Sequence, residues 1–187
     1  MKKIGIIVGS LREQSYNRMI AATVPELGLE EEAAYEYISI ADLPLYNADL
    51  DTGDGPEAVR LYREAIRGAD GLLIVSPEYN SGIPGVLKNA LDWASTPTRT
   101  AALIHKPVGI VGATPGPKGT ILSQQQIRQT LEATQAWVLP FQKMYISQAM
   151  DKVDAERGRL TDETTLKYLK RYVQTLLGWI DQSEELK

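Results

Sequence analysis

Polar side chains able to bind an anion follow the first apolar segment of the chain. Ile4 to Val8 leads directly into Gly9-Ser10-Leu11-Arg12-Glu13-Gln14-Ser15-Tyr16-Asn17, which groups hydroxyl, guanidinium and amide side chains. If a helix begins near Ser15, its first N–H groups and its dipole favour an anion at the same point. Many donors with few glycines suit a terminal phosphate monoester, whereas a pyrophosphate needs glycines for close backbone approach. The alternative is that Ser15 only caps the helix and Ser10 only turns the chain.

A second loop of turn-forming residues follows the apolar segment Gly71 to Val75. Its sequence is Ser76-Pro77-Glu78-Tyr79-Asn80-Ser81-Gly82-Ile83-Pro84-Gly85. Such residues build a firm wall whose N–H groups can face a flat heteroaromatic ring. The alternative is an ordinary strand-to-helix turn with a packed tyrosine.

The third loop, Gly112-Ala113-Thr114-Pro115-Gly116-Pro117-Lys118-Gly119-Thr120, ends in Lys, Gly and Thr like a phosphate-binding loop. It does not match the G-x-x-x-x-G-K-[ST] pattern, because Pro117 precedes the lysine and Gly119 follows it. A flexible wall or lid is the better interpretation.

Composition excludes several other kinds of site. The 187-residue chain has no cysteine, which rules out thiol chemistry and thiolate metal sites, and its only histidine is His105. His105 precedes Lys106-Pro107 at the entry of the fourth expected strand, so we expect a structural role and no catalytic triad. Gly9-Ser10 stand where a receiver domain needs an acidic pair, and no G-x-G-x-x-G occurs. With 20 basic and 24 acidic residues, the net charge of −4 argues against nucleic-acid binding.

Five segments predict the strands that position these loops. Ile4 to Val8, Gly71 to Val75 and Val108 to Gly112 are almost wholly apolar, as in strands buried on both faces. Tyr35 to Ile40 and Val138 to Ser147 mix polar and apolar residues, which indicates edge strands. Helices are expected from about Ser15 until Pro25 stops or kinks the chain, over 56–69, over 84–94 and from 161 onward. The charged stretch 151–159 is expected to be a solvated loop.

Alternating strands and helices predict one α/β domain over residues 1–187. We expect a flavodoxin-like three-layer sandwich around a five-stranded parallel sheet of order 2-1-3-4-5, because the two mixed segments then lie at the edges. Ligands of such sheets bind beyond the carboxyl ends of the strands, so the three loops above form the candidate site. Met1-Lys2-Lys3 leads into an apolar run too short for a signal peptide, and we expect a cytoplasmic protein without membrane attachment.

The chain resembles the NAD(P)H-dependent FMN reductases, a family that includes bacterial quinone, chromate and azo-dye reductases. The similarity lies in Gly9-Ser10-Leu11-Arg12 with Ser15 and Asn17, in Asp42-Leu43-Pro44-Leu45-Tyr46-Asn47, and in Ser76-Pro77-Glu78-Tyr79-Asn80 with Ile83-Pro84-Gly85-Val86-Leu87-Lys88-Asn89-Ala90-Leu91-Asp92-Trp93. It covers nearly the whole chain, as far as Arg159-Leu160-Thr161-Asp162-Glu163.

This resemblance implies a flavodoxin-like subunit that holds FMN, takes hydride from NADPH or NADH and passes electrons to a small-molecule acceptor by a ping-pong mechanism. No side chain is expected to act as catalytic acid or base, and no metal is implied. Ser10, Arg12, Ser15 and Asn17 would hold the phosphate, and Pro77, Glu78, Tyr79, Asn80 and Ser81 would line the isoalloxazine ring. The third loop departs from the family pattern at Thr114 and Thr120, so Gly112, Thr114, Gly116 and Gly119 are expected only as a general flavin wall.

The resemblance also implies a homodimer or homotetramer, for which Val86 and Trp93 on the 84–94 helix are candidates if they do not complete the core. One alternative function is a flavodoxin-type carrier of single electrons, although such carriers are usually far more acidic. A nicotinamide-only Rossmann enzyme is disfavoured by the missing glycine motif. The sequence leaves open the choice between NADH and NADPH and the identity of the acceptor.

Overall fold

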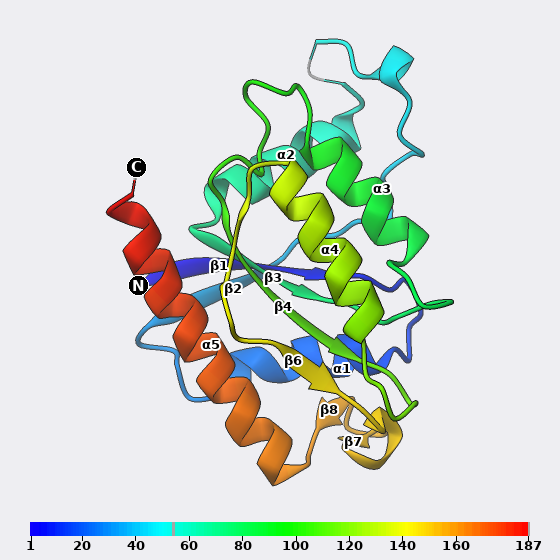
Figure 1. Ribbon diagram of the computed structural model, residues 1–187, viewed down its shortest axis with the longest axis vertical. Coiled ribbons are helices and arrows are strands. Elements are labelled where there is room, and N and C mark those ends of the chain that lie inside the picture. The colour runs from blue at the N-terminus through cyan, green and yellow to red at the C-terminus, as the bar shows by residue number, and fades with distance from the viewer. Residues whose placement is uncertain (54, 187) are drawn as a thin grey trace.

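The computed structural model describes residues 1–53 and 55–186 and shows a three-layer α/β sandwich (Figure 1). Its main sheet is parallel, with the order β2-β1-β3-β4-β5, and β6 also pairs with β4. The strands are β1 (Lys2–Val8), β2 (Ala33–Tyr37), β3 (Gly71–Val75), β4 (Pro107–Ala113), β5 (Trp137–Val138) and β6 (Met144–Ile146). The predicted fold class and strand order are confirmed.

Helices cover both faces of this sheet. They are α1 (Tyr16–Thr23), α2 (Glu57–Gly68), α3 (Gly85–Ala94), α4 (Ile121–Ala133) and α5 (Glu163–Glu184). One buried cluster joins α1 and α5 to the sheet, and a second joins α2, α3 and α4 to its other face. All residues of β3 and β4 are buried, which explains why these segments are apolar without alternation.

The helix ends follow the signals in the sequence. The α1 helix stops at Thr23, and the short 3₁₀ helix Val24–Glu26 that follows contains Pro25. Asp162 caps α5, because its carboxylate accepts a 2.7 Å hydrogen bond from the Thr165 N–H. Within the described residues, no helix is both long enough and apolar enough to cross a lipid bilayer.

The single fifth strand expected over Val138 to Ser147 is wrong. Two short strands, β5 and β6, pair with opposite ends of β4 and are separated by residues 139–143. Pro140 has no N–H to donate to a sheet, and Phe141 next to it has a positive φ of 62° and is 98% exposed. The break is braced by Arg128, which donates 3.1 Å hydrogen bonds to the carbonyl oxygens of Leu139 and Gln142.

The second strand also begins and ends earlier than expected. It ends at Tyr37, although Ile38 and Ile40 beyond it are still buried. Ile38 and Ile40 are apolar because they are buried in the loop after the strand, and this is why the sequence predicted a strand as far as residue 40.

The charged stretch 151–159 is not a simple solvated loop. It contains β7 (Val153–Asp154), which pairs with β8 (Arg159–Leu160) in an antiparallel hairpin. The hairpin is attached to α1 and its 3₁₀ extension, because the Leu160 N–H donates to Thr23 Oγ1 at 3.0 Å and Arg159 pairs with Glu26 at 2.9 Å. Thr23 and Glu26 lie more than 130 residues before the hairpin in the sequence. The charged residues of 151–159 therefore could not indicate that this segment packs on α1.

Two residues discussed as candidates lie away from the three loops. His105 precedes β4, at the amino end of the strand, and its ring stacks on Trp137 with centroids 4.8 Å apart. Trp93 is completely buried in the core, so it is not available to an interface between subunits.

Arg63 on α2 ties three segments together. Its guanidinium donates to Asp51 at 2.8 Å, to the Thr96 hydroxyl at 2.6 Å and to the Trp93 carbonyl at 2.9 Å. The side chains of Arg63 and Asp51 are almost fully buried. Burial by itself raises the pKa of the Asp51 carboxyl, but hydrogen bonds from Thr96 and Arg63 and the guanidinium charge outweigh it, so the pKa lies below its ordinary 3.8.

We predict that Arg63→Met lowers the free energy of unfolding by about 3 to 5 kcal/mol at neutral pH, because it leaves the buried Asp51 carboxylate without its cation. Arg60→Met is the matched control on the same helix. It removes exposed pairs with Glu57 and Glu64 and should cost no more than about 1 kcal/mol. Chemical denaturation measures both changes.

The cost of Arg63→Met should also depend on pH. Because the folded-state pKa of Asp51 is lowered, the stabilisation is present above its ordinary value and is lost as the pH falls through the folded-state value. The difference in the free energy of unfolding between the parent and Arg63→Met should therefore become smaller below pH 3.8. Two results would contradict the role given to the Arg63–Asp51 pair. They are equal losses of unfolding free energy in Arg63→Met and Arg60→Met, and a loss in Arg63→Met that does not change in acid.

Candidate functional site

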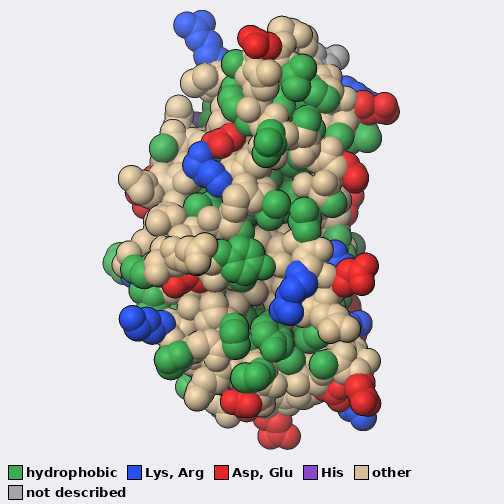
Figure 2. All heavy atoms as spheres, turned by 90° about the vertical axis from the view of Figure 1, so that its right-hand side faces the viewer, with side chains coloured by type: hydrophobic (Ala, Val, Ile, Leu, Met, Phe, Trp, Pro, Cys, Tyr) green, Lys and Arg blue, Asp and Glu red, His purple; other side chains and the backbone are tan. Residues whose placement is uncertain are grey.

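The three loops singled out in the sequence meet at the carboxyl edge of the sheet. They follow β1, β3 and β4, which are neighbours in the sheet and end at the same edge. This edge is on the right in Figure 1 and faces the viewer in Figure 2, where hydrophobic side chains lie between isolated basic and acidic ones. The first loop contacts the second through the Ser10 and Tyr79 hydroxyls, 3.3 Å apart.

Two glycines allow this close approach. A Cβ at Gly9 would lie 2.5 Å from Ser76 Oγ, and one at Gly112 would lie 2.5 Å from the Ser76 carbonyl oxygen and collide with the Thr120 hydroxyl. Gly112 is buried within β4. Its place is therefore in the packing beneath the loops.

The first loop retains unused hydrogen-bond donors at the start of α1. Ser15 is the N-cap residue of α1, yet its side chain makes no capping hydrogen bond. Ser10 and Ser15 are only 3% and 2% exposed, and the first turn of α1 has no acidic residue. The first intrahelical hydrogen bond is donated by Met19, so the preceding N–H groups have no acceptor within the helix. This donor set fits an anion, and capping alone does not explain Ser15.

Arg12 is exposed beside these donors. Its guanidinium lies 5.4 Å from the centre of the Tyr16 ring, a cation–π contact that holds it over the start of α1. Within residues 1–53 and 55–186, no carboxylate forms an ion pair with it.

Asn17 has a different position from the other three phosphate candidates. Its buried amide exchanges two hydrogen bonds of 2.9 Å with the backbone of Ala113 and so fastens α1 to the end of β4. One Nδ2 hydrogen remains beyond this pair, so Asn17 can give at most one hydrogen bond to a phosphate.

The second loop forms a rigid projecting turn. Tyr79 and Gly82 exchange backbone hydrogen bonds of 3.1 and 3.0 Å around Asn80 and Ser81, which both have positive φ, the pattern of a type I′ turn. Tyr79 is 49% exposed, and Asn80 and Ser81 are exposed as well. The structure thus has the shaped, outward-facing wall that the turn-forming residues predicted.

Pro77 and Glu78 lie beneath this turn. Pro77 is buried, and its carbonyl oxygen accepts a 3.0 Å hydrogen bond from the Ser123 hydroxyl. The Glu78 carboxylate accepts two 2.9 Å hydrogen bonds from the N–H groups of Leu122 and Ser123, in the first turn of α4. Glu78 therefore caps α4, which makes it a support of the ring wall.

Two residues of α4 that support the wall were missed in the sequence. Ser123 holds Pro77, and Gln126 accepts a 2.9 Å hydrogen bond from the Ile83 N–H. One available signal is that the first turn of α4 contains no acid, so a carboxylate from elsewhere in the chain is needed there. No pattern in the sequence distinguishes Gln126 from an ordinary exposed glutamine.

The third loop is folded on itself. The Thr114 hydroxyl donates to the carbonyl oxygens of Gly119 at 3.0 Å and Gly116 at 3.4 Å. Gly119 is buried with a positive φ of 63°, and a Cβ there would lie 3.0 Å from Cβ of Tyr145. Thr114 and Gly116 thus shape the loop, and Gly119 packs it against β6.

One hollow borders the site, and a second lies apart from it. The first, of about 610 Å³, reaches the first loop at Ser10 and Leu11, and its other walls come from β1, α1 with the 3₁₀ helix after it, β2 with the segment that follows, and β8. A larger one, about 700 Å³, lies between β6 and α5. Among the residues that the structure describes, no three His, Cys, Asp or Glu side chains gather as a metal site would require.

Comparison with known proteins agrees with this geometry. Residues 2–151 match the model of the NADPH-dependent FMN reductase family. An NAD(P)H-dependent FMN reductase of Pseudomonas aeruginosa is 40% identical over 181 residues, covering 96% of this chain and 95% of its own. A 2-hydroxy-1,4-benzoquinone reductase of Burkholderia sp. is 38% identical over 178 residues, 95% of this chain and 96% of its own.

A solved structure shares both fold and sequence. The flavoenzyme NAD(P)H:(acceptor) oxidoreductase FerB of Paracoccus denitrificans superposes with a TM-score of 0.86 at 33% identity, covering 98% of this chain and 99% of its own. The family match, the two relatives and this solved structure agree with one another. The chain belongs to the NADPH-dependent FMN reductase family.

Proposed function

We propose that this protein is an NAD(P)H-dependent FMN reductase of the quinone-reductase type. It would pass hydride from a nicotinamide to bound FMN and on to a quinone, flavin, azo or metal-oxyanion acceptor in a ping-pong sequence. The observation that carries the proposal is the contact between Ser10 and Tyr79, which joins a loop of anion-binding donors to a projecting wall. The first loop would thus bind the phosphate of one molecule, and the adjacent second loop would contact its flat ring.

The phosphate would lie at the start of α1. Ser10 and Ser15 supply hydroxyls, Arg12 supplies a charge-assisted donor from the exposed side, and α1 supplies N–H groups and its dipole. Asn17 mainly positions this helix through Ala113. Arg12 is the one full positive charge on the loop, so it should discriminate most strongly between FMN and a flavin without phosphate.

The flavin ring would lie against the turn Tyr79–Gly82. When bound, FMN supplies N5 of the isoalloxazine ring as the hydride acceptor. The chain's own contribution is to hold two rings at reacting distance and exclude water between them. Glu78 is the one acid of the second loop, and its carboxylate is engaged by α4, so it is not placed to move a proton.

We predict that Arg12→Ala weakens FMN binding by about 10-fold or more and that Ser15→Ala weakens it as well, because each change removes a donor to the phosphate. Riboflavin, which has no phosphate, is the control ligand and should lose little affinity. Fluorescence titration of the flavin-free protein measures both. Equal losses for FMN and riboflavin would argue against a phosphate at this loop.

We predict that anaerobic NADPH or NADH bleaches the visible spectrum of the FMN-loaded protein, and that His105→Ala slows this reaction by no more than a few-fold. General acid or base roles are worth about 10² to 10⁴-fold, whereas His105 stacks on Trp137 at the opposite end of the sheet. Tyr79→Ala should slow reduction or release flavin. Asn80→Ala strains a positive φ, and Asn80→Gly tests whether the turn or the amide is needed.

Stopped-flow absorbance gives these rates. FMN that binds but is not reduced by either nicotinamide would favour the flavodoxin-type electron carrier. A hundredfold loss in His105→Ala with FMN still bound would show that a proton transfer was overlooked.

We also propose that the protein forms a homodimer or homotetramer in the cytoplasm, where its nicotinamide substrate is produced. Exposed apolar side chains are available for subunit contact at Leu45, Leu122 and Phe141. Light scattering at micromolar concentration should give at least twice the chain mass of 20.7 kDa. A mass of a single chain would contradict the assembly while leaving the site unchanged.

A further inference from the structure

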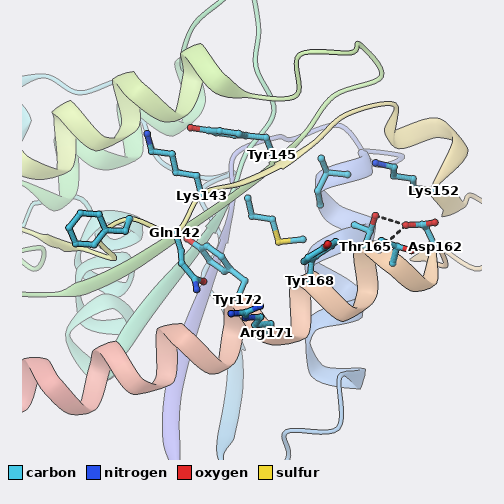
Figure 3. A pocket seen from close by; sticks show the side chains of 13 residues that line it. Gln142, Lys143, Tyr145, Lys152, Asp162, Thr165, Tyr168, Arg171 and Tyr172 are labelled. Carbon is cyan, nitrogen blue, oxygen red and sulfur yellow. Dashed lines mark hydrogen bonds between the residues drawn. The ribbon is translucent and has the colours of Figure 1, made fainter.

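A second concave region lies outside the loops discussed above. It is the hollow of about 700 Å³ between edge strand β6 and helix α5, within the size range of small-molecule sites (Figure 3). Met144 and Ile146 of β6 and Thr165 and Tyr172 of α5 are its buried side chains. The Tyr172 hydroxyl accepts a 2.7 Å hydrogen bond from the Ile110 N–H, so the ring is fixed as a wall.

The charge around this hollow is mainly positive. Lys143, Lys152 and Arg171 come from three separate segments and lie on different sides of it (Figure 3). In the described ranges 1–53 and 55–186, no carboxylate forms an ion pair with any of them. Asp162 is the acid of the lining. Hydrogen bonds of 2.7 and 2.5 Å from Thr165 lower the pKa of its carboxyl, and the charge of Lys152 acts in the same direction.

Arg128 adds a further positive charge beside the hollow. Its terminal nitrogens donate to backbone carbonyls, its Nε is buried without an acceptor, and no carboxylate of the described chain pairs with it. The Gln142 carbonyl oxygen that accepts one of these hydrogen bonds belongs to a residue of the lining, so the Arg128 charge lies next to the hollow. The cations of the lining and the neighbouring Arg128 therefore both favour an anion in the hollow.

Flat rings and hydroxyl groups complete the lining. Tyr168 on α5 is 61% exposed and can stack on a heterocycle. Tyr145 lies between Met144 and Ile146 on β6 and points to the other face of the strand, toward α4 (Figure 3). Separated cations suit a ligand with negative groups at two places better than one compact ion. We propose that the hollow binds a nucleotide that carries phosphate groups at two separated positions, with its base against the exposed ring of Tyr168.

Two sources of such a ligand share this chemistry. One is a free nucleoside bisphosphate, and the other is the adenosine end of NADPH, which carries a 2′-phosphate and a 5′-diphosphate. The third loop connects the hollow with the candidate flavin site, because Gly119 packs on Tyr145 and the Thr114 N–H donates to the Ile146 carbonyl oxygen at 3.1 Å.

Calorimetric titration of the FMN-saturated protein tests the proposal, since saturation fills the first-loop anion site. Adenosine 2′,5′-bisphosphate should bind more tightly than AMP, and inorganic phosphate least. Lys143→Ala, Lys152→Ala and Arg171→Ala should each weaken the bisphosphate by about 10-fold, and added salt should weaken it too. Lys167→Ala, an exposed lysine of α5 outside the lining, is the matched control and should change affinity less than about twofold.

Kinetics then separate the two sources. A raised KM for NADPH with an unchanged KM for NADH in the three variants identifies the adenosine end of the cosubstrate, whereas unchanged constants with weakened bisphosphate binding identify a separate nucleotide. This kinetic comparison, and the use of FMN to fill the first loop, rest on the proposed function. A protein that binds the bisphosphate but is not reduced by NAD(P)H would defeat the proposed function alone.

Three results would overturn the proposal. They are no bisphosphate binding at millimolar concentration, binding no tighter than that of inorganic phosphate, and binding that survives in Lys143→Ala, Lys152→Ala and Arg171→Ala alike. The substituted lysine and arginine side chains have no ion pair in the described chain, so the folds of these variants should be intact, which circular dichroism verifies.

Discussion

The close approach of three strand ends is the constraint on which the candidate site depends. A parallel sheet covered by helices on both faces brings the carboxyl ends of β1, β3 and β4 to one edge. Gly9 and Gly112 then let the backbones come so near that a methyl group at either position would collide with Ser76 or Thr120. The donors at the start of α1 and the turn Tyr79–Gly82 are adjacent because these two positions lack side chains.

Electrostatic pairing between loops has a second organising effect. The N-terminus of α4 attracts negative charge, and Glu78 from the preceding β3–α3 loop supplies it. This contact fixes the wall and leaves the N-termini of α1 and α3 without a capping side chain or an acid in their first turns. Of these two helix ends, α1 is the one beside Ser10, Arg12 and Ser15. A flavin ring would therefore meet backbone groups and the exposed turn, and catalysis would rest on placement of the two rings.

The third loop and β6 connect two regions that differ in charge. On one side lie the hydroxyl and amide donors of the first two loops, and on the other lies the basic hollow beside α5. Thr114 and Gly119 give the connecting loop an internal hydrogen bond and a tight contact with β6, which fix its position between the two regions. The break of the edge strand at Pro140 is what frees Lys143 and Tyr145 to border that hollow.

The sequence by itself determined the sheet order, because the length of the apolar runs and the mixed character of two of them report directly on burial. It also determined the first two loops, since turn-forming residues and hydroxyls act over a few neighbouring positions. Only the tertiary structure decided that Asn17 binds Ala113, that Glu78 caps α4, that 151–159 forms a hairpin on α1 and that the fifth strand is broken. Each of these depends on partners distant in the chain, and local patterns of charge and hydrophobicity carry no information about which distant groups the fold brings within hydrogen-bonding range.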